Sequence, residues 1–164
     1  MIEVLILLLG IGLGVYIGYK YADVKSKKVI ASKTALSNKH LRLFEFTTEW
    51  LKLHQENKNL VEFFEYNKFK SVIVYGASYL GECLIKELES NGIEVTYVID
   101  KKKMDTFCNK KVCGLNAPLE EADAIVVTAF TFFDSIEEEL LKVTDMPIIS
   151  LDEILRDVQR NNKC

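Results

Sequence analysis

The 164-residue sequence has few of the residues that build metal centres and catalytic sites. It contains two prolines, two histidines and four cysteines. No two cysteines have the C-x-x-C spacing of zinc or redox sites, and both histidines precede the part of the chain with alternating strand and helix patterns. These absences argue against a zinc site, a dithiol redox motif and a catalytic Ser/His/Asp or Cys/His set. We therefore predict no catalytic and no metal-binding residues, and we expect Cys83 to be a small buried side chain.

Net charge is also low, at −3, but it is divided unevenly along the chain. Residues 20–43 carry seven basic side chains against Asp23 alone, a local charge of +6. Residues 44–164 carry 14 basic and 22 acidic side chains, a local charge of −8. Nucleic-acid binding needs a positive folded surface, so this acidic part predicts no nucleic-acid partner.

The N-terminal segment contains 16 consecutive uncharged residues, Val4–Tyr19. Spanning a bilayer takes ~17–25 predominantly apolar residues, so this run is near the short limit. Tyr16, Tyr19 and Tyr21 lie where an interfacial aromatic belt would be. We predict a transmembrane anchor over residues 1–21. The alternatives are a cleaved signal peptide, which lacks a positive leading region here, and a buried core helix.

The flanks of this segment predict its orientation. All nearby basic residues follow it, and lysine and arginine stay on the cytoplasmic side. The expected protein is therefore a single-pass protein of the inner or cell membrane with its domain facing the cytoplasm. Gly10, Gly14 and Gly18 form overlapping G-x-x-x-G steps, which allow a homodimer through close helix pairing. The alternative is the general glycine enrichment of membrane helices.

Residues 22–67 are expected to be a basic linker followed by amphipathic helices. Residues 29–66 contain no proline or glycine, and two series of apolar residues recur every seven positions. The series are Leu36, Leu43 and Trp50, and Phe46, Leu53 and Leu60. Either a coiled-coil stalk or a helix docked on the domain or a partner fits this pattern. Trp50 is awkward in a tight dimer seam, which favours docking.

Residues 68–160 have the pattern of an α/β domain. Short apolar runs at 71–75, 94–99, 111–113, 124–128 and 147–150 alternate with helical periodicity. Strands that alternate with helices form a parallel sheet covered on both faces. We therefore predict a small Rossmann-like domain with a five-stranded parallel sheet in the order 3-2-1-4-5.

The motif that could carry a binding function is Gly76-Ala77-Ser78-Tyr79-Leu80-Gly81, between the first strand and its helix. It keeps the first and third glycines of the dinucleotide-binding pattern G-x-G-x-x-G but has Ser78 at the second. Asp100 closes the second strand 24 residues after Gly76, where a ribose-binding carboxylate would lie; a plain strand-end turn residue is an equal alternative. The candidate cofactor-binding residues are Gly76, Ala77, Ser78, Tyr79, Gly81, Asp100 and Thr128.

A family resemblance is carried by several stretches together. They are W-L-K-L-H-Q-E-N-K-N-L from Trp50, V-I-V-Y-G-A-S-Y-L-G, V-T-Y-V-I-D, I-V-V-T-A, F-F-D-S-I-E-E-E-L and P-I-I-S-L-D-E-I-L, which ends at Leu155. The region resembles small Rossmann-like modules that accompany bacterial glycosyltransferases of capsule and surface-polysaccharide synthesis. The part up to Asp100 is also similar to the N-terminal nucleotide-sugar-binding domain of bacterial sugar acyltransferases.

The resemblance implies a binding role without catalysis. In the acyltransferases the glycine-rich turn and the acidic strand end face the nucleotide, which corresponds here to Gly76, Ala77, Ser78 and Asp100. The chain has no glycosyltransferase or left-handed β-helix acyltransferase domain. We expect an accessory module that binds a nucleotide-sugar or NAD(P), with a glycosyltransferase or other polysaccharide-assembly protein as partner. The alternatives are an NAD(P)-dependent oxidoreductase or sugar-nucleotide epimerase, and an interaction domain with a vestigial nucleotide site.

Overall fold

The structure is a computed structural model that describes residues 2–102, 104–115, 119 and 121–161, without the side chains of residues 3–9 and 11. The chain divides into two compact units, Met1–Glu45 and Phe46–Cys164. We describe each unit by itself.

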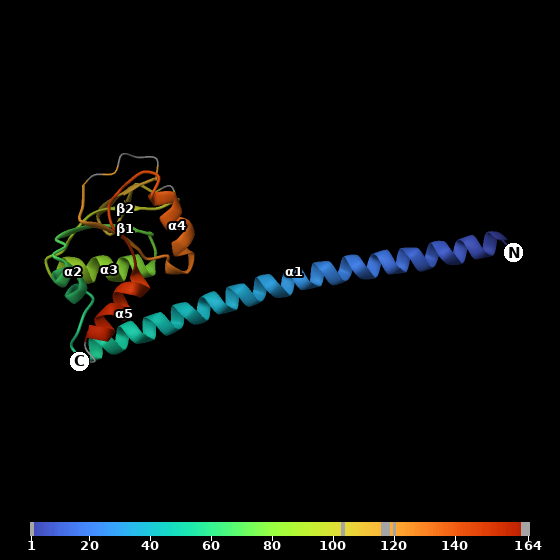
Figure 1. The fold of residues 1–164 in the computed structure, drawn as a ribbon, viewed down its shortest axis with the longest axis horizontal. Coiled ribbons are helices and arrows are strands. Elements are labelled where there is room, and N and C mark those ends of the chain that lie inside the picture. The colour runs from blue at the N-terminus through green and yellow to red at the C-terminus, as the bar shows by residue number, and fades with distance from the viewer. Residues whose placement is uncertain (1, 103, 116–118, 120, 162–164) are drawn as a thin grey trace. The chain divides into compact units, whose positions relative to one another are not determined.

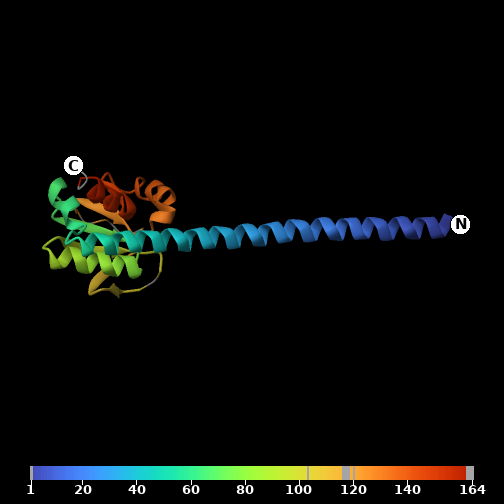
Figure 2. The ribbon, with the colours of Figure 1, turned by 90° about the horizontal axis from the view of Figure 1, so that it is seen from below.

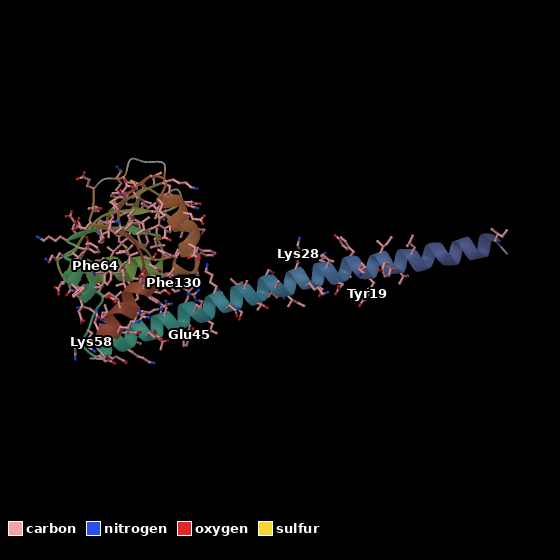
Figure 3. The ribbon with its side chains drawn as sticks, in the orientation of Figure 1. Tyr19, Lys28, Glu45, Lys58, Phe64 and Phe130 are labelled. Carbon is pink, nitrogen blue, oxygen red and sulfur yellow. The ribbon has the colours of Figure 1, made fainter. Side chains whose placement is uncertain are left out.

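The first unit contains helix α1 (Ile2–Gln55) as far as Glu45, and the last turns of this helix belong to the second unit. No glycine or proline interrupts it after Gly18, and Lys27 and Asp23 form an ion pair of 2.8 Å one turn apart. The described side chains of this unit are mostly exposed; Tyr19 and Lys28 are examples (Figure 3). A Cβ at Gly10, Gly14 or Gly18 would meet nothing within 4 Å, and pairing with a second copy stays a prediction.

The membrane-spanning prediction is wrong. Among the residues that the structure describes, no helix combines the length and apolar character needed to cross a bilayer. A helical run of 16 residues rises about 24 Å, short of the ~30 Å hydrocarbon core. The run also contains four glycines and two tyrosines, and Lys20 follows at once. This finding contradicts the predicted transmembrane anchor over residues 1–21. It also contradicts the single-pass, cytoplasm-facing localisation that was derived from that anchor.

The second unit is built around a six-stranded mixed sheet with the order β3-β4-β2-β1-β5-β6. Its strands are β1 (Ser71–Tyr75), β2 (Glu94–Ile99), β3 (Thr106–Phe107), β4 (Lys110–Cys113), β5 (Ala124–Val127) and β6 (Ile148–Ser150) (Figure 1). The pairs from β4 through β6 are all parallel.

The α/β class is confirmed, but the prediction of a five-stranded, wholly parallel sheet is wrong. Strand β3 pairs with β4 in the antiparallel direction, with Thr106 opposite Lys111 and Phe107 opposite Lys110. The connecting residues Cys108 and Asn109 have φ angles of 50° and 61°. Two successive residues with positive φ form the tight turn that suits a twisted hairpin. This hairpin adds the sixth strand at the edge.

Helices cover both faces of the sheet. The second unit contains the last turns of α1, α2 (Val61–Asn67), α3 (Tyr79–Ser90), the 3-10 turn η1 (Phe130–Phe132), α4 (Phe133–Leu140) and α5 (Leu151–Asn161). Figure 2 shows α3 on one face and α4 and α5 on the other. Because strand side chains alternate between faces, a sheet covered on both sides needs nearly continuous apolar strands. All four residues of β5 are buried.

The core is formed by apolar side chains of the central strands and of the helices. One cluster joins Ile73, Tyr75, Tyr97, Ile99, Ile125 and Val127 of the sheet to Ile136 and Leu140 of α4. Phe64 of α2 and Phe130 of η1 are also buried within the unit (Figure 3). This packing fixes the carboxyl ends of β1, β2 and β5, from which the candidate site is built.

Candidate functional site at the carboxyl ends of β1, β2 and β5

The turn after β1 has a shape that requires its two glycines. Gly76 has a φ of +116°, and a Cβ there would overlap Thr128 Oγ1. A Cβ on Gly81 would overlap the carbonyl oxygen of Gly76. Glycine is the residue that tolerates such backbone and such close approach. Both glycines therefore support the turn whether or not a ligand binds.

The Asp100 carboxylate lies against this turn. Its Oδ2 accepts a hydrogen bond of 2.7 Å from the Ala77 N–H, and its Oδ1 accepts one of 2.7 Å from the Lys102 N–H. The backbone N–H of Asp100 donates to Cys113 O at 3.1 Å, which keeps the end of β2 beside β4. A carboxylate oxygen has two lone-pair sites. Each Asp100 oxygen can therefore accept a further hydrogen bond besides the one given by the backbone.

Thr128 has a structural position behind the turn. It is 2% exposed, and its hydroxyl donates to Tyr75 O at 3.0 Å and approaches Gly76 O at 3.3 Å. These contacts tie the end of β5 to the end of β1. Burial raises the pKa of the neighbouring Tyr75 phenol, while the charge of Lys101 acts in the opposite direction. The Thr128 side chain thus supports the turn.

Ser78 lies in the turn between β1 and α3, as the sequence motif predicts, and it is the N-cap residue of α3. Its backbone is extended, with φ −133°, so a side chain causes no strain there. Its Oγ accepts from the Gly81 N–H at 3.4 Å and caps the N-terminus of α3. The side chain is exposed, so it supports the start of α3 without being part of the core. Tyr79, the next residue, is 90% exposed.

Glu82 lies in the first turn of α3, where its charge would oppose a bound phosphate. Its Oε1 accepts a hydrogen bond of 2.6 Å from Lys86 Nζ, one turn along the helix. This pairing partly offsets the negative charge near the helix start.

Of the candidate residues, the structure brings Gly76, Ala77, Ser78, Asp100 and Thr128 together at this turn.

A second feature, which the sequence did not reveal, is a groove between the last turns of α1 and α3. Its volume is about 590 Å³. The lining residues are Thr47, Trp50, Leu51 and His54 from α1 and Leu80, Cys83, Lys86, Glu87, Ser90 and Asn91 from α3 and the residue after it. Cys83 is exposed here, which corrects the expectation that it is buried.

Glu87 lines this groove and accepts hydrogen bonds from Trp50 and Leu60. Its Oε2 accepts from Trp50 Nε1 at 2.8 Å and lies 2.9 Å from His54 Nε2, and its Oε1 accepts from the Leu60 N–H at 2.6 Å. Phe46, Trp50 and Leu53 are buried. For these turns of α1 the structure shows docking on the domain. The heptad pattern located the apolar face, but its anchor on α3 depends on residues distant in sequence.

Three phenylalanines follow β5, and Phe132 is the one that is 53% exposed. Phe130 is buried against Phe46, with ring centroids 4.8 Å apart, and Phe133 packs on the core cluster. The described residues contain no group of three or more His, Cys, Asp or Glu side chains that could hold a metal ion.

No protein-family model matches this chain, and neither a curated protein nor a solved structure matches it at a significant level.

Proposed function

We propose that the Phe46–Cys164 unit binds a ribose-containing phosphate ligand, a nucleotide or nucleotide-sugar, at the turn after β1, and that it does so without catalysis. The observation that carries this proposal is the position of Asp100. Its carboxylate lies 2.7 Å from the Ala77 N–H of the turn and keeps an acceptor site on each oxygen. Ribose hydroxyls are donors that such sites can accept.

The place of the turn in the sheet supports the same proposal. Strand β1 has β2 on one side and β5 on the other. The chain therefore passes from β1 to one side of it to form β2, and it later crosses to the opposite side of β1 to form β5. In open α/β sheets, ligands bind outside the carboxyl ends of the strands at such a point. The start of α3 follows directly and provides backbone N–H groups for a phosphate.

The resemblance to polysaccharide-assembly modules favours a nucleotide-sugar over other ribose ligands. On that basis the partner would be a glycosyltransferase or another polysaccharide-assembly protein, and the module would sense or present the ligand.

A second candidate is an interaction domain whose nucleotide site is vestigial. The observation that favours it is the Ala77 N–H, which already donates to Asp100 and is therefore occupied. The same experiment separates the two candidates, because only the first predicts a ligand that stabilises the folded domain.

The test is a thermal-shift screen of the full chain against UDP-sugars, CDP-activated compounds, NAD(H), NADP(H) and CoA. A ligand at a hundredfold excess over its Kd stabilises the folded state by ~2.7 kcal/mol. We expect Ser78→Trp, which places a large side chain at the exposed turn, to abolish the shift. Ser78→Ala is the matched control, because it removes the cap at a cost of ~1 kcal/mol but adds no bulk.

Three results are informative. A shift that survives in Ser78→Ala and disappears in Ser78→Trp supports the proposed site. A shift that persists in Ser78→Trp places the ligand elsewhere. Wild-type protein that responds to no nucleotide favours the interaction domain.

A further inference from the structure

One stretch of helix α1 in the first unit combines exposed apolar side chains with an excess of positive charge. Residues 24–44 contain six basic side chains and no acidic one. Four aliphatic side chains of this stretch, which we call the apolar face, are 45% to 60% exposed; they are Val29, Ile30, Leu36 and Leu41. Removing such side chains from water is favourable, so a partner that covers them gains free energy.

Helix geometry places the apolar face on one side of α1. Successive residues of an α-helix are turned by about 100° around its axis, so these four side chains fall within an arc of about 140°. Four of the basic side chains lie on the opposite side; they are Lys27, Lys28, Lys39 and Arg42. Lys33 lies within the apolar arc, where its long side chain can carry the ammonium group to the edge. The stretch is therefore a basic amphipathic helix.

The charge of this stretch distinguishes between the partners that could cover the apolar face. A second copy of the helix would bring two positive stretches together, and like charges at short range repel. A nucleic acid would meet the lysines but would leave the apolar face without a contact. A lipid surface with anionic headgroups fits both features, because apolar side chains enter the boundary of the acyl chains while lysines meet the headgroups.

We infer that residues 24–44 bind an anionic lipid surface, with the helix lying in the plane of that surface and the apolar face directed into it. Such a contact does not cross the bilayer, and it lies outside the segment 1–21 for which the membrane span was predicted. The inference is independent of the nucleotide site, because it uses only residues of the first unit.

The experiment is flotation of the full chain with two kinds of vesicle, one of phosphatidylcholine alone and one of phosphatidylcholine mixed with phosphatidylglycerol. Wild-type protein should bind the mixed vesicles at least tenfold more tightly, since each lysine near an anionic surface contributes about fivefold. Lys28→Gln should therefore weaken binding to the mixed vesicles by about fivefold. Added salt should reduce the preference for the mixed vesicles, because it screens the headgroup charges.

Variants of the apolar face test the orientation of the helix. Ile30→Ser and Leu36→Ser should each weaken binding to the mixed vesicles by about tenfold, because each removes an aliphatic side chain that enters the lipid. Val24→Ser is the matched control. Val24 is 57% exposed on the same helix, but it lies on the basic side, so this variant should bind as wild type does.

Several results would overturn this inference. Wild-type protein that binds neither vesicle, or both equally well, contradicts the anionic surface, and Ile30→Ser and Leu36→Ser that match Val24→Ser contradict the apolar face. Sedimentation equilibrium without vesicles tests the second copy, because a wild-type dimer that Leu36→Ser dissociates would assign the face to helix pairing. Binding of polyuridylate that is tighter than binding of mixed vesicles, and equal in Leu36→Ser, would assign the charge to nucleic acid.

Discussion

Two carboxylates of the Phe46–Cys164 unit are fixed by hydrogen bonds, and they differ in what fixes them. Glu87 accepts from Trp50 and Leu60 and lies 2.9 Å from His54 Nε2, and its side chain is 7% exposed. These donors come from segments 27 to 37 residues away. Asp100 accepts two backbone N–H groups, from Ala77 and Lys102, and is only partly buried.

The difference in donors distinguishes Glu87, a structural carboxylate, from Asp100, which keeps acceptor sites for a ligand. Glu87 joins α1, the start of α2 and α3, and the chain itself supplies most of its acceptor capacity. Asp100 is oriented by its backbone contacts, which use one acceptor site on each oxygen. We therefore expect Glu87 substitutions to change stability and Asp100 substitutions to change binding.

The largest effect is expected for Glu87→Ala. It leaves the Trp50 indole N–H and the Leu60 N–H without their acceptor in a part-buried site, which should lower the free energy of unfolding by about 3 kcal/mol or more. Urea denaturation measures the change, with exposed Glu138→Ala as the control. Equal stability of the two variants would mean that Glu87 does not hold the docked helix.

The next effect concerns the core beneath the site. Val126 is fully buried in β5, and Val126→Ala should cost about 2 kcal/mol through lost apolar contacts and the remaining cavity. Val143→Ala, at a position 51% exposed, is the control and should stay within about 0.5 kcal/mol of wild type. An unchanged melting temperature for Val126→Ala would contradict the assignment of β5.

Thr128→Val tests whether this candidate residue is structural. The variant removes the hydroxyl that donates to Tyr75 O, so the free energy of unfolding should fall by about 1 kcal/mol. Nucleotide affinity of the folded protein should be unchanged within twofold. A loss of affinity well beyond the loss of stability would place Thr128 among the ligand contacts.

The smallest effect is expected at Asp123, at the opposite end of β1. The backbone N–H groups of Lys70 and Ser71 donate to its carboxylate at 2.7 and 2.9 Å and hold its pKa below the ordinary value. A lowered folded-state pKa gives stability above the unfolded pKa, near ~4, and loses it as pH falls through the folded value. Because Asp123 is exposed, Asp123→Asn should cost less than about 1 kcal/mol at pH 7.

Thermal unfolding between pH 7 and pH 2.5 checks this sign. The difference between wild type and Asp123→Asn should shrink as the pH falls below about 4. A difference that grows toward low pH would contradict the assigned hydrogen bonds.

Sequence reasoning succeeded where the pattern is local. The alternation of apolar runs with helical periodicity predicted the α/β class, and Gly76 and Gly81 predicted a tight turn between strand and helix. The hairpin strand β3 was missed because it is two residues long and its turn is Cys108-Asn109, without the glycine that usually announces such turns. The transmembrane prediction gave too much weight to the apolar N-terminal run, because 16 residues are at the short limit of a membrane span.

The candidate site was predictable in its residues but not in their roles. The spacing from Gly76 to Asp100 located the carboxylate, and its contact with Ala77 needed the pairing of β1 with β2. Thr128 is among the candidate residues from sequence, but its hydrogen bonds to β1 appear only once β5 lies beside β1. Glu87 carried no local signal, because its donors are brought together by the docking of α1.

The most direct test of the account compares a ribonucleotide with the same nucleotide lacking both ribose hydroxyls. UDP and 2′,3′-dideoxy-UDP are titrated into the full chain and into Asp100→Ala. If the open acceptor sites of Asp100 bind ribose, wild type should prefer UDP by about tenfold, since a hydrogen bond to a charged group contributes ~1.5–3 kcal/mol. Asp100→Ala should lose that preference. Equal binding of the two ligands by wild-type protein, or a preference that survives in Asp100→Ala, would contradict the account.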